Sequence, residues 1–152
     1  MRKPPLPLMM PPPILFALTF AAGALIQWLA GAPPRWTSGE IEGFLVLGVA
    51  FVFSVVLVAM LLSRRTTLNP FGKPSAFVAS GAYRFSRNPM YLALILIYLG
   101  GVLAYGSLWP LLLIVFPVMV LDRVVVPYEE QQLTEAFGET YSAYSAKVRR
   151  WL

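Results

Sequence analysis

Long apolar runs separated by short polar segments dominate the first 126 residues. Residues 14–31 form an uncharged run of 18 positions, residues 43–62 one of 20, and residues 88–121 one of 34. A helix that crosses a bilayer needs about 20 apolar residues, so each of the first two runs predicts one span. The third run would measure about 51 Å as one helix, well beyond a hydrocarbon core of about 30 Å. We therefore expect it to fold back on itself.

A turn at Gly106-Ser107, followed by Pro110, divides this third run, because glycine, serine and proline favour turns over helix interiors. The pattern predicts an all-α integral membrane protein with about four transmembrane helices, the third and fourth forming a tight hairpin. The predicted spans are 14–31, 43–62, 90–105 and 108–126. We expect one domain over residues 1–152, with cytoplasmic segments at 63–91 and 127–152.

The last segment carries an amphipathic pattern of a different kind. Apolar and aromatic residues recur every three or four positions, which is typical of a helix with one buried face. These residues are Leu133, Phe137, Tyr141, Tyr144 and Val148. Gly138 is expected to divide the segment into two short helices, at 128–137 and 140–147.

Composition supports the membrane assignment and removes several chemistries. The chain is 58% hydrophobic and 12% charged, with a mean hydropathy of +0.69. Soluble domains carry about 25% charged residues and cannot hide this much apolar surface at such a length. The absence of cysteine excludes disulfides and thiolate sites, and the absence of histidine removes the commonest general base and metal ligand. We expect no metal site.

The basic residues indicate the orientation in the membrane. Of twelve Lys and Arg residues, eleven fall before the first span, around residues 64–87, or from Arg123 onward; the exception is Arg35. By the positive-inside rule, both termini and the central loop face the cytoplasm, and we expect a prokaryotic inner membrane. The net charge of +5 then suits anionic headgroups, not nucleic acid. The proline-rich start imitates a signal peptide, but we expect it to be retained.

Two polar clusters flank the hairpin. Arg87-Asn88-Pro89-Met90-Tyr91 has an ordinary interpretation as a helix start, with Asn88 as cap and Pro89 in the first turn. Glu129 and Glu130 follow the fourth span, and adjacent helical residues diverge by about 100°, so at most one should face a pocket. The pair could be a solvated acidic surface or a ligand for hydroxyl and ammonium groups. Both interpretations stay open at this point.

Aromatic and small residues also allow two interpretations. The two cytoplasmic segments are rich in tyrosine, which either packs or offers the aromatic faces that a sulfonium requires. These tyrosines are Tyr83, Tyr91, Tyr128, Tyr141 and Tyr144. Gly100-Gly101 indicates close helix packing, because it lies within an apolar run with no preceding strand. Asp122 and Arg123 lie near the inner edge of the hydrocarbon region, where charges are functional candidates.

The order of these features resembles the isoprenylcysteine carboxyl methyltransferase family and its phospholipid methyltransferase-like relatives. The resemblance runs from about residue 71 to residue 150 and rests on Gly81-Ala82-Tyr83, the stretch 87–91, a hairpin, and Glu129-Glu130. It implies a membrane enzyme that uses S-adenosylmethionine, releases S-adenosylhomocysteine, and methylates a lipid or another membrane-partitioned acceptor. The cofactor-binding residues that it implies are Phe77, Val78, Tyr83, Asn88, Pro89, Met90, Tyr91, Glu129, Glu130, Leu133 and Tyr144. The catalytic candidates are Arg87, Asn88 and Arg123.

Two positions depart from that family's pattern. Members commonly have histidine where this chain has Asn88, and carboxyl-methylating members have arginine where it has Val125. Two other classes remain as alternatives. A small transporter or scaffold subunit would more naturally place polar groups in mid-membrane and show an internal repeat. A sterol-reductase-like enzyme would need a longer chain and basic groups for a 2′-phosphate.

Overall fold

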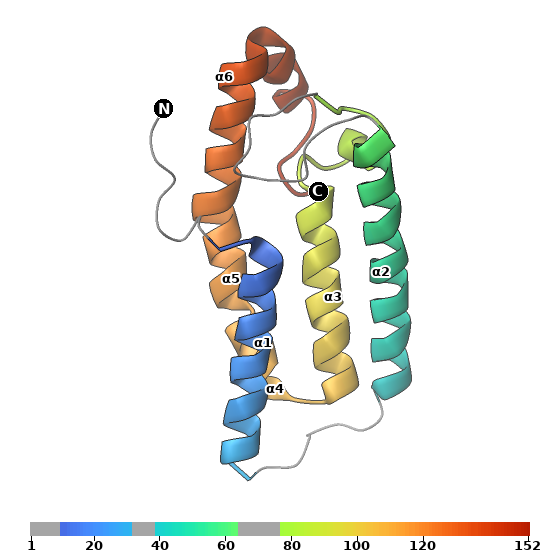
Figure 1. The fold of residues 1–152 in the computed structure, drawn as a ribbon, viewed down its shortest axis with the longest axis vertical. Coiled ribbons are helices and arrows are strands. Elements are labelled where there is room, and N and C mark those ends of the chain that lie inside the picture. Colours follow the sequence, from blue (N-terminus) through green and yellow to red (C-terminus); the bar gives the residue numbers. More distant parts are fainter. Residues whose placement is uncertain (1–9, 32–38, 64–76) are drawn as a thin grey trace.

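The computed structural model describes residues 10–31, 39–63 and 77–152, and these ranges are almost entirely helical. Within them no strand occurs. The longer helices lie roughly side by side, and the C-terminal one extends beyond the others (Figure 1). The helices are α1 (Pro12–Leu29), α2 (Glu40–Ser63), α3 (Pro89–Tyr105), α4 (Leu108–Leu113), α5 (Val115–Val120) and α6 (Val126–Ser145). The proline-rich start and the basic stretch 64–76 lie outside the described residues.

Helix length and composition confirm the all-α membrane architecture. Three helical stretches of the described chain are long and apolar enough to cross a bilayer: α1, α2 and the run from Leu108 to Ser145. Helix α3 is apolar as well, with 17 residues. The helices begin and end within three residues of the first three predicted spans.

The predicted hairpin is confirmed at Gly106-Ser107. Helix α3 ends in a left-handed Gly106 (φ 67°, ψ 37°), a conformation that costs other residues about 1–2 kcal/mol. The Ser107 hydroxyl then accepts a hydrogen bond from the Trp109 amide at 3.3 Å and so caps α4. Ser107 also donates to Gln27 Oε1 at 2.9 Å, which ties the turn to α1.

Glycines let α3 pack closely against its neighbours. A Cβ atom on Gly43 of α2 would lie 2.3 Å from the Ala104 nitrogen, and one on Gly100 would lie 2.9 Å from the Leu47 side chain. On the other side of the bundle, a Cβ on Gly23 of α1 would lie 2.6 Å from a backbone nitrogen of α4. Small residues at these positions bring the backbones together, as expected for helices in lipid. The prediction that Gly100 serves helix packing is confirmed.

The fourth span is less regular than predicted. It breaks at Ile114 between α4 and α5, and one π-helical turn, η3 (Leu121–Val125), precedes α6. Proline explains both irregularities, because Pro117 and Pro127 lack the amide that a carbonyl four residues earlier would bond. Helix α6 therefore continues directly from the span and does not start as a separate cytoplasmic helix.

The predicted break at Gly138 is confirmed, since its backbone is non-helical (φ 49°, ψ −120°) inside α6. The stretch after it ends at Ser145, two residues earlier than predicted.

A small buried core fixes where α6 leaves the bundle. It joins α1, α3 and η3 through Phe16, Tyr98, Val102, Leu121 and Val125. The Phe16 and Tyr98 rings meet edge to face at 5.8 Å, and the Tyr98 hydroxyl donates to the Pro110 carbonyl at 2.8 Å. Because η3 is anchored in this core, the first turns of α6 have a fixed position relative to the start of α3.

Candidate functional site

The two polar clusters predicted from the sequence come together at one end of the bundle, where α3 begins and α6 extends past the other helices (Figure 1). We call this the motif end: residues 77–91 together with 122–152. The hydroxyl of Tyr91, in the first turn of α3, donates a hydrogen bond to Glu129 Oε1 at 2.5 Å. Residues 38 positions apart in the sequence are thereby joined in one site.

Glu129 is a carboxyl group of perturbed acidity at the motif end. Desolvation raises the pKa of its carboxyl group from 4.5 to about 7. The hydrogen bond from Tyr91 opposes this rise, and the charge of Glu130 adds to it. Among the described residues, no Lys or Arg forms an ion pair with Glu129. A desolvated carboxylate without a cation is suited to receive a cationic ligand.

Glu130 has the opposite environment. It pairs with Arg87 Nη1 at 3.0 Å and with Arg150 Nη2 at 2.7 Å, and Arg150 Nε also donates to it at 3.2 Å. The two neighbouring glutamates thus point to different partners, as their helical spacing requires. The charge of Glu130 is balanced by two arginines, whereas no Lys or Arg in the described part of the chain pairs with Glu129.

Asn88 does not act as the side-chain cap that its ordinary interpretation predicts. It occupies the N-cap position of α3, but its side chain makes no capping hydrogen bond. Its Nδ2 atom donates instead to the carbonyl oxygen of Arg150 at 3.0 Å. Pro89 does occupy the first helical position, so that part of the interpretation is confirmed.

Aromatic rings cover the side of the motif end near residue 77. The Phe77 ring lies 5.6 Å from that of Phe137, 5.9 Å from Tyr141 and 5.1 Å from Tyr144, between ring centroids. The Tyr144 hydroxyl donates to the Tyr83 carbonyl at 2.7 Å. Desolvation raises the pKa of Tyr144 to about 12 and that of Tyr83 further still, so both phenols are neutral.

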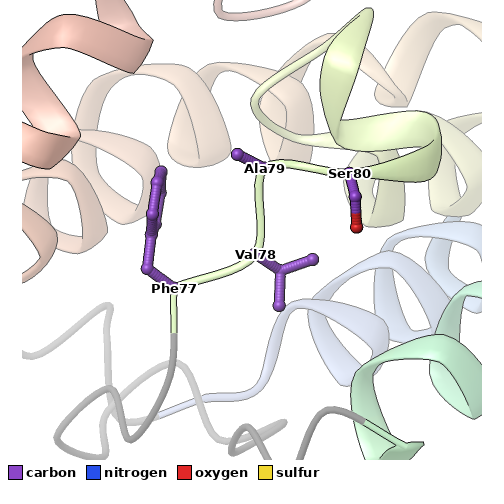
Figure 2. Close-up of a pocket in the computed structure, with 4 residues that line it drawn as sticks. All are labelled: Phe77, Val78, Ala79 and Ser80. Atoms are coloured by element: carbon purple, nitrogen blue, oxygen red, sulfur yellow. The ribbon is translucent and has the colours of Figure 1, made fainter.

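A pocket of about 310 Å³ opens beside these rings. Its described lining is the stretch Phe77, Val78, Ala79 and Ser80, with the Phe77 and Val78 side chains pointing in different directions from the backbone (Figure 2). Two predicted cofactor residues therefore border a space large enough for part of a small ligand.

The other predicted site residues differ in how closely they join this cluster. Met90 and Leu133 are half-buried within α3 and α6. Arg123 has a side chain that is 82% exposed, and its ion pair is with Asp122 at 3.4 Å. The structure thus does not bring Arg123 to the Glu129 carboxylate.

Sequence reasoning missed the contribution of Ser86, Arg150 and Trp151. Ser86 Oγ donates to the Arg150 carbonyl at 3.3 Å, and Trp151 Nε1 donates to Asp122 at 3.0 Å. No signal in the sequence points to a backbone carbonyl as acceptor, because every residue carries one. The amphipathic pattern that ends at Val148 indicated a helix with one buried face, but not which residues that face contacts.

Comparison with known proteins places these residues in a family. The sequence model of the phospholipid methyltransferase family matches residues 40–140, from the start of α2 into the last turns of α6. The chain belongs to the phospholipid methyltransferase family. Membership confirms the resemblance drawn from the motifs and indicates a membrane methyltransferase. It favours that class over a transporter subunit or a sterol-reductase-like enzyme.

This phospholipid methyltransferase family chain also has a short bacterial relative. It is 38% identical over 63 residues to an uncharacterized protein of Haemophilus influenzae. The alignment covers 41% of this chain and all of that protein. No solved structure matches the chain at a significant level.

Proposed function

We propose that the protein transfers a methyl group from S-adenosylmethionine to a lipid or another membrane-partitioned acceptor, and that the motif end binds the cofactor on the cytoplasmic side. The observation that carries the proposal is Glu129: a desolvated carboxyl group, held by Tyr91, with no cationic partner among the described residues. Family membership supplies the reaction class.

The residues of the motif end fit such a cofactor by their chemistry. S-adenosylmethionine carries an ammonium and a sulfonium, both cations, and a nearby cation would favour ionised Glu129. Aromatic faces of Tyr83 and Tyr91 suit the sulfonium. Arg87 Nε is buried with no hydrogen-bond partner among the described groups, so a donor is available for a ligand oxygen.

Within this proposal, residues around Glu129 would hold the cofactor, which when bound supplies an electrophilic methyl group. Glu129 would accept hydrogen bonds from the ammonium or from ribose hydroxyls, and Tyr91 would keep its carboxylate oriented. The remaining proposed neighbours are Phe77, Val78, Asn88, Pro89, Met90, Glu130, Leu133 and Tyr144.

The chain's own contribution to the reaction is alignment and exclusion of water. Methyl transfer is a direct displacement that gains more from positioning and desolvation than from a strong base. The described site offers no histidine, and neutral Tyr83 and Tyr144 are poor bases. An acceptor that already presents a lone pair at neutral pH, such as a carboxylate, would need neither of these groups as a base. We propose that it enters sideways from the bilayer.

Calorimetry with S-adenosylhomocysteine on the purified protein in detergent tests the cofactor assignment. We expect saturable binding by the native chain and a loss of about 10- to 100-fold in affinity for Glu129→Gln, the usual range for a charged hydrogen-bond partner. Glu139→Gln is the matched control, because Glu139 is an exposed residue of the same helix. No binding by the native chain, or equal losses in both variants, would refute the assignment.

The acceptor class needs a separate measurement. Methyl-labelled S-adenosylmethionine is incubated with the protein in vesicles of phosphatidylethanolamine, with or without an added long-chain carboxylic acid. We expect label in the organic-soluble fraction, with more label when the carboxylic acid is present. Label that stays entirely in water-soluble products would contradict a membrane-partitioned acceptor.

A further inference from the structure

The last residues of the chain fold back over the start of α3. Residues 146–152, which we call the return segment, follow α6 and offer backbone carbonyls to the stretch 86–88. The Arg87 amide donates to the Arg149 carbonyl at 3.0 Å. Asn88 Nδ2 and Ser86 Oγ both donate to the Arg150 carbonyl, at 3.0 and 3.3 Å.

Side chains of the return segment hold the other side of the site. The Arg150 guanidinium binds both carboxylate oxygens of Glu130 and lies 3.5 Å from Asp122 Oδ1. Trp151 donates to the same Asp122 oxygen at 3.0 Å and packs against the buried core. Two-point binding of a carboxylate by arginine fixes direction as well as distance. The backbone of the return segment is therefore attached to the stretch 86–88 just before α3, and its side chains are attached to η3 and α6.

This double attachment matters because α3 and α6 share few direct contacts of their own. The hydrogen bond between Tyr91 and Glu129 joins these two helices, so its geometry depends on what holds them in register. Tyr91 lies three residues after Asn88, and Glu129 directly precedes Glu130. Two of the partners of Arg150, Asn88 and Glu130, thus lie close in the sequence to the two groups that form the site.

We propose that Arg150 is a positioning residue for the methyl-transfer site, an inference that rests on the proposed function. Its carbonyl holds the turn before α3 and its guanidinium holds the start of α6. Together these contacts keep Tyr91 and Glu129 in the arrangement that receives the cofactor. Arg150 acts through Asn88 and Glu130.

The test compares Arg150→Gln with Arg149→Gln. Both remove one positive charge from adjacent positions, but the Arg149 side chain is exposed, and Arg149 contacts the Arg87 amide through its backbone carbonyl. Two quantities are measured: amide hydrogen exchange of the peptide that contains residues 85–91, and the affinity for S-adenosylhomocysteine. Exchange needs no ligand and reports whether the return segment has been released.

For Arg150→Gln we expect exchange at Arg87 and Asn88 to rise about tenfold and ligand affinity to fall about tenfold, as for the loss of a charged hydrogen bond. Arg149→Gln should leave both quantities unchanged. Arg150→Lys keeps the charge without the two-point geometry, so its affinity for S-adenosylhomocysteine should fall about threefold. This variant serves as the test if Arg150→Gln does not fold.

Two results would overturn the positioning role. Unchanged exchange in Arg150→Gln would show that the side chain does not hold the return segment. Raised exchange with unchanged affinity would reduce the contact to a structural one. Failure of the proposed function looks different: the native chain would not bind S-adenosylhomocysteine at all, and a rise in exchange would then report only fold stability.

Discussion

Replacing Glu129 with glutamine should stabilise the ligand-free protein, slightly in mild acid and most at neutral and alkaline pH. Glutamine keeps an oxygen that can accept the hydrogen bond from Tyr91, but it carries no charge to desolvate. In the native chain the pKa of Glu129 is about 7, compared with 4.5 for the unperturbed group. The folded state therefore holds this proton more tightly than the unfolded chain does.

The sign and size of the effect follow from this difference. As the pH rises from about 4.5 to about 7, the unfolded chain releases the proton while the folded chain retains it, so native stability falls through that window and is constant above it. At about 1.4 kcal/mol per pKa unit, the penalty above pH 7 is at most about 3.5 kcal/mol. Near pH 5 it shrinks to under about 1 kcal/mol. Glu129→Gln removes the penalty.

Thermal unfolding of the native chain and of Glu129→Gln in the same detergent, at about pH 5 and about pH 8, measures this pH-dependent penalty. We expect the midpoint of Glu129→Gln to exceed that of the native chain by several degrees at the higher pH and to nearly match it at the lower. Glu139→Gln should show no pH-dependent difference. An equal offset at both pH values, or a lower midpoint at pH 8, would refute the reasoning. A variant that is more stable but binds S-adenosylhomocysteine less tightly would mark Glu129 as a functional group kept at a cost in stability.

Three further outcomes are expected. Asn88→Asp should lose the donor to the Arg150 carbonyl and destabilise the protein by about 1–3 kcal/mol. Asn88→His keeps a donor, so its melting temperature and its affinity for S-adenosylhomocysteine should be closer to those of the native chain. A higher melting temperature or tighter binding for Asn88→Asp, in thermal unfolding or calorimetry, would contradict this. Gly43→Leu should separate α2 from α3, because even a Cβ would lie 2.3 Å from the Ala104 nitrogen; a native-like yield and midpoint in detergent would argue against this packing. In the otherwise cysteine-free chain, Ser75→Cys should resist impermeant labelling from outside intact cells, and ready labelling would reverse the proposed orientation.

The transmembrane architecture could be predicted because its physical basis is local. An uncharged run of 20 residues has one stable arrangement in a bilayer, and a run of 34 must turn where glycine and serine allow it. The irregular fourth span was not predicted, although its cause was visible. Pro117 and Pro127 each remove one amide donor. Whether the helix then breaks or forms a π turn depends on its packing against neighbouring helices.

The site was less accessible from the sequence, because its contacts join distant segments. The residue types at 87–91 and 129–130 indicated which groups to consider, and the hydrogen bond between Tyr91 and Glu129 joins the two segments. The capping interpretation of Asn88 was wrong, because a helix start favours a capping side chain and nothing local reveals that the Arg150 carbonyl lies nearby.

The π turn also bears on which of the two glutamates faces α3. Adjacent residues on a helix point about 100° apart, so the sequence allows one of Glu129 and Glu130 to face a given neighbour but cannot select it. A π turn adds one residue to the helical circuit and rotates everything after it by about 100° relative to a regular helix. With η3 in place, Glu129 faces Tyr91 and Glu130 faces Arg87 and Arg150. In a regular helix, a residue next to Glu129 would point toward Tyr91 in its place. The missing amide of Pro127 thus helps determine which of the two carboxylates has no cationic partner among the described residues.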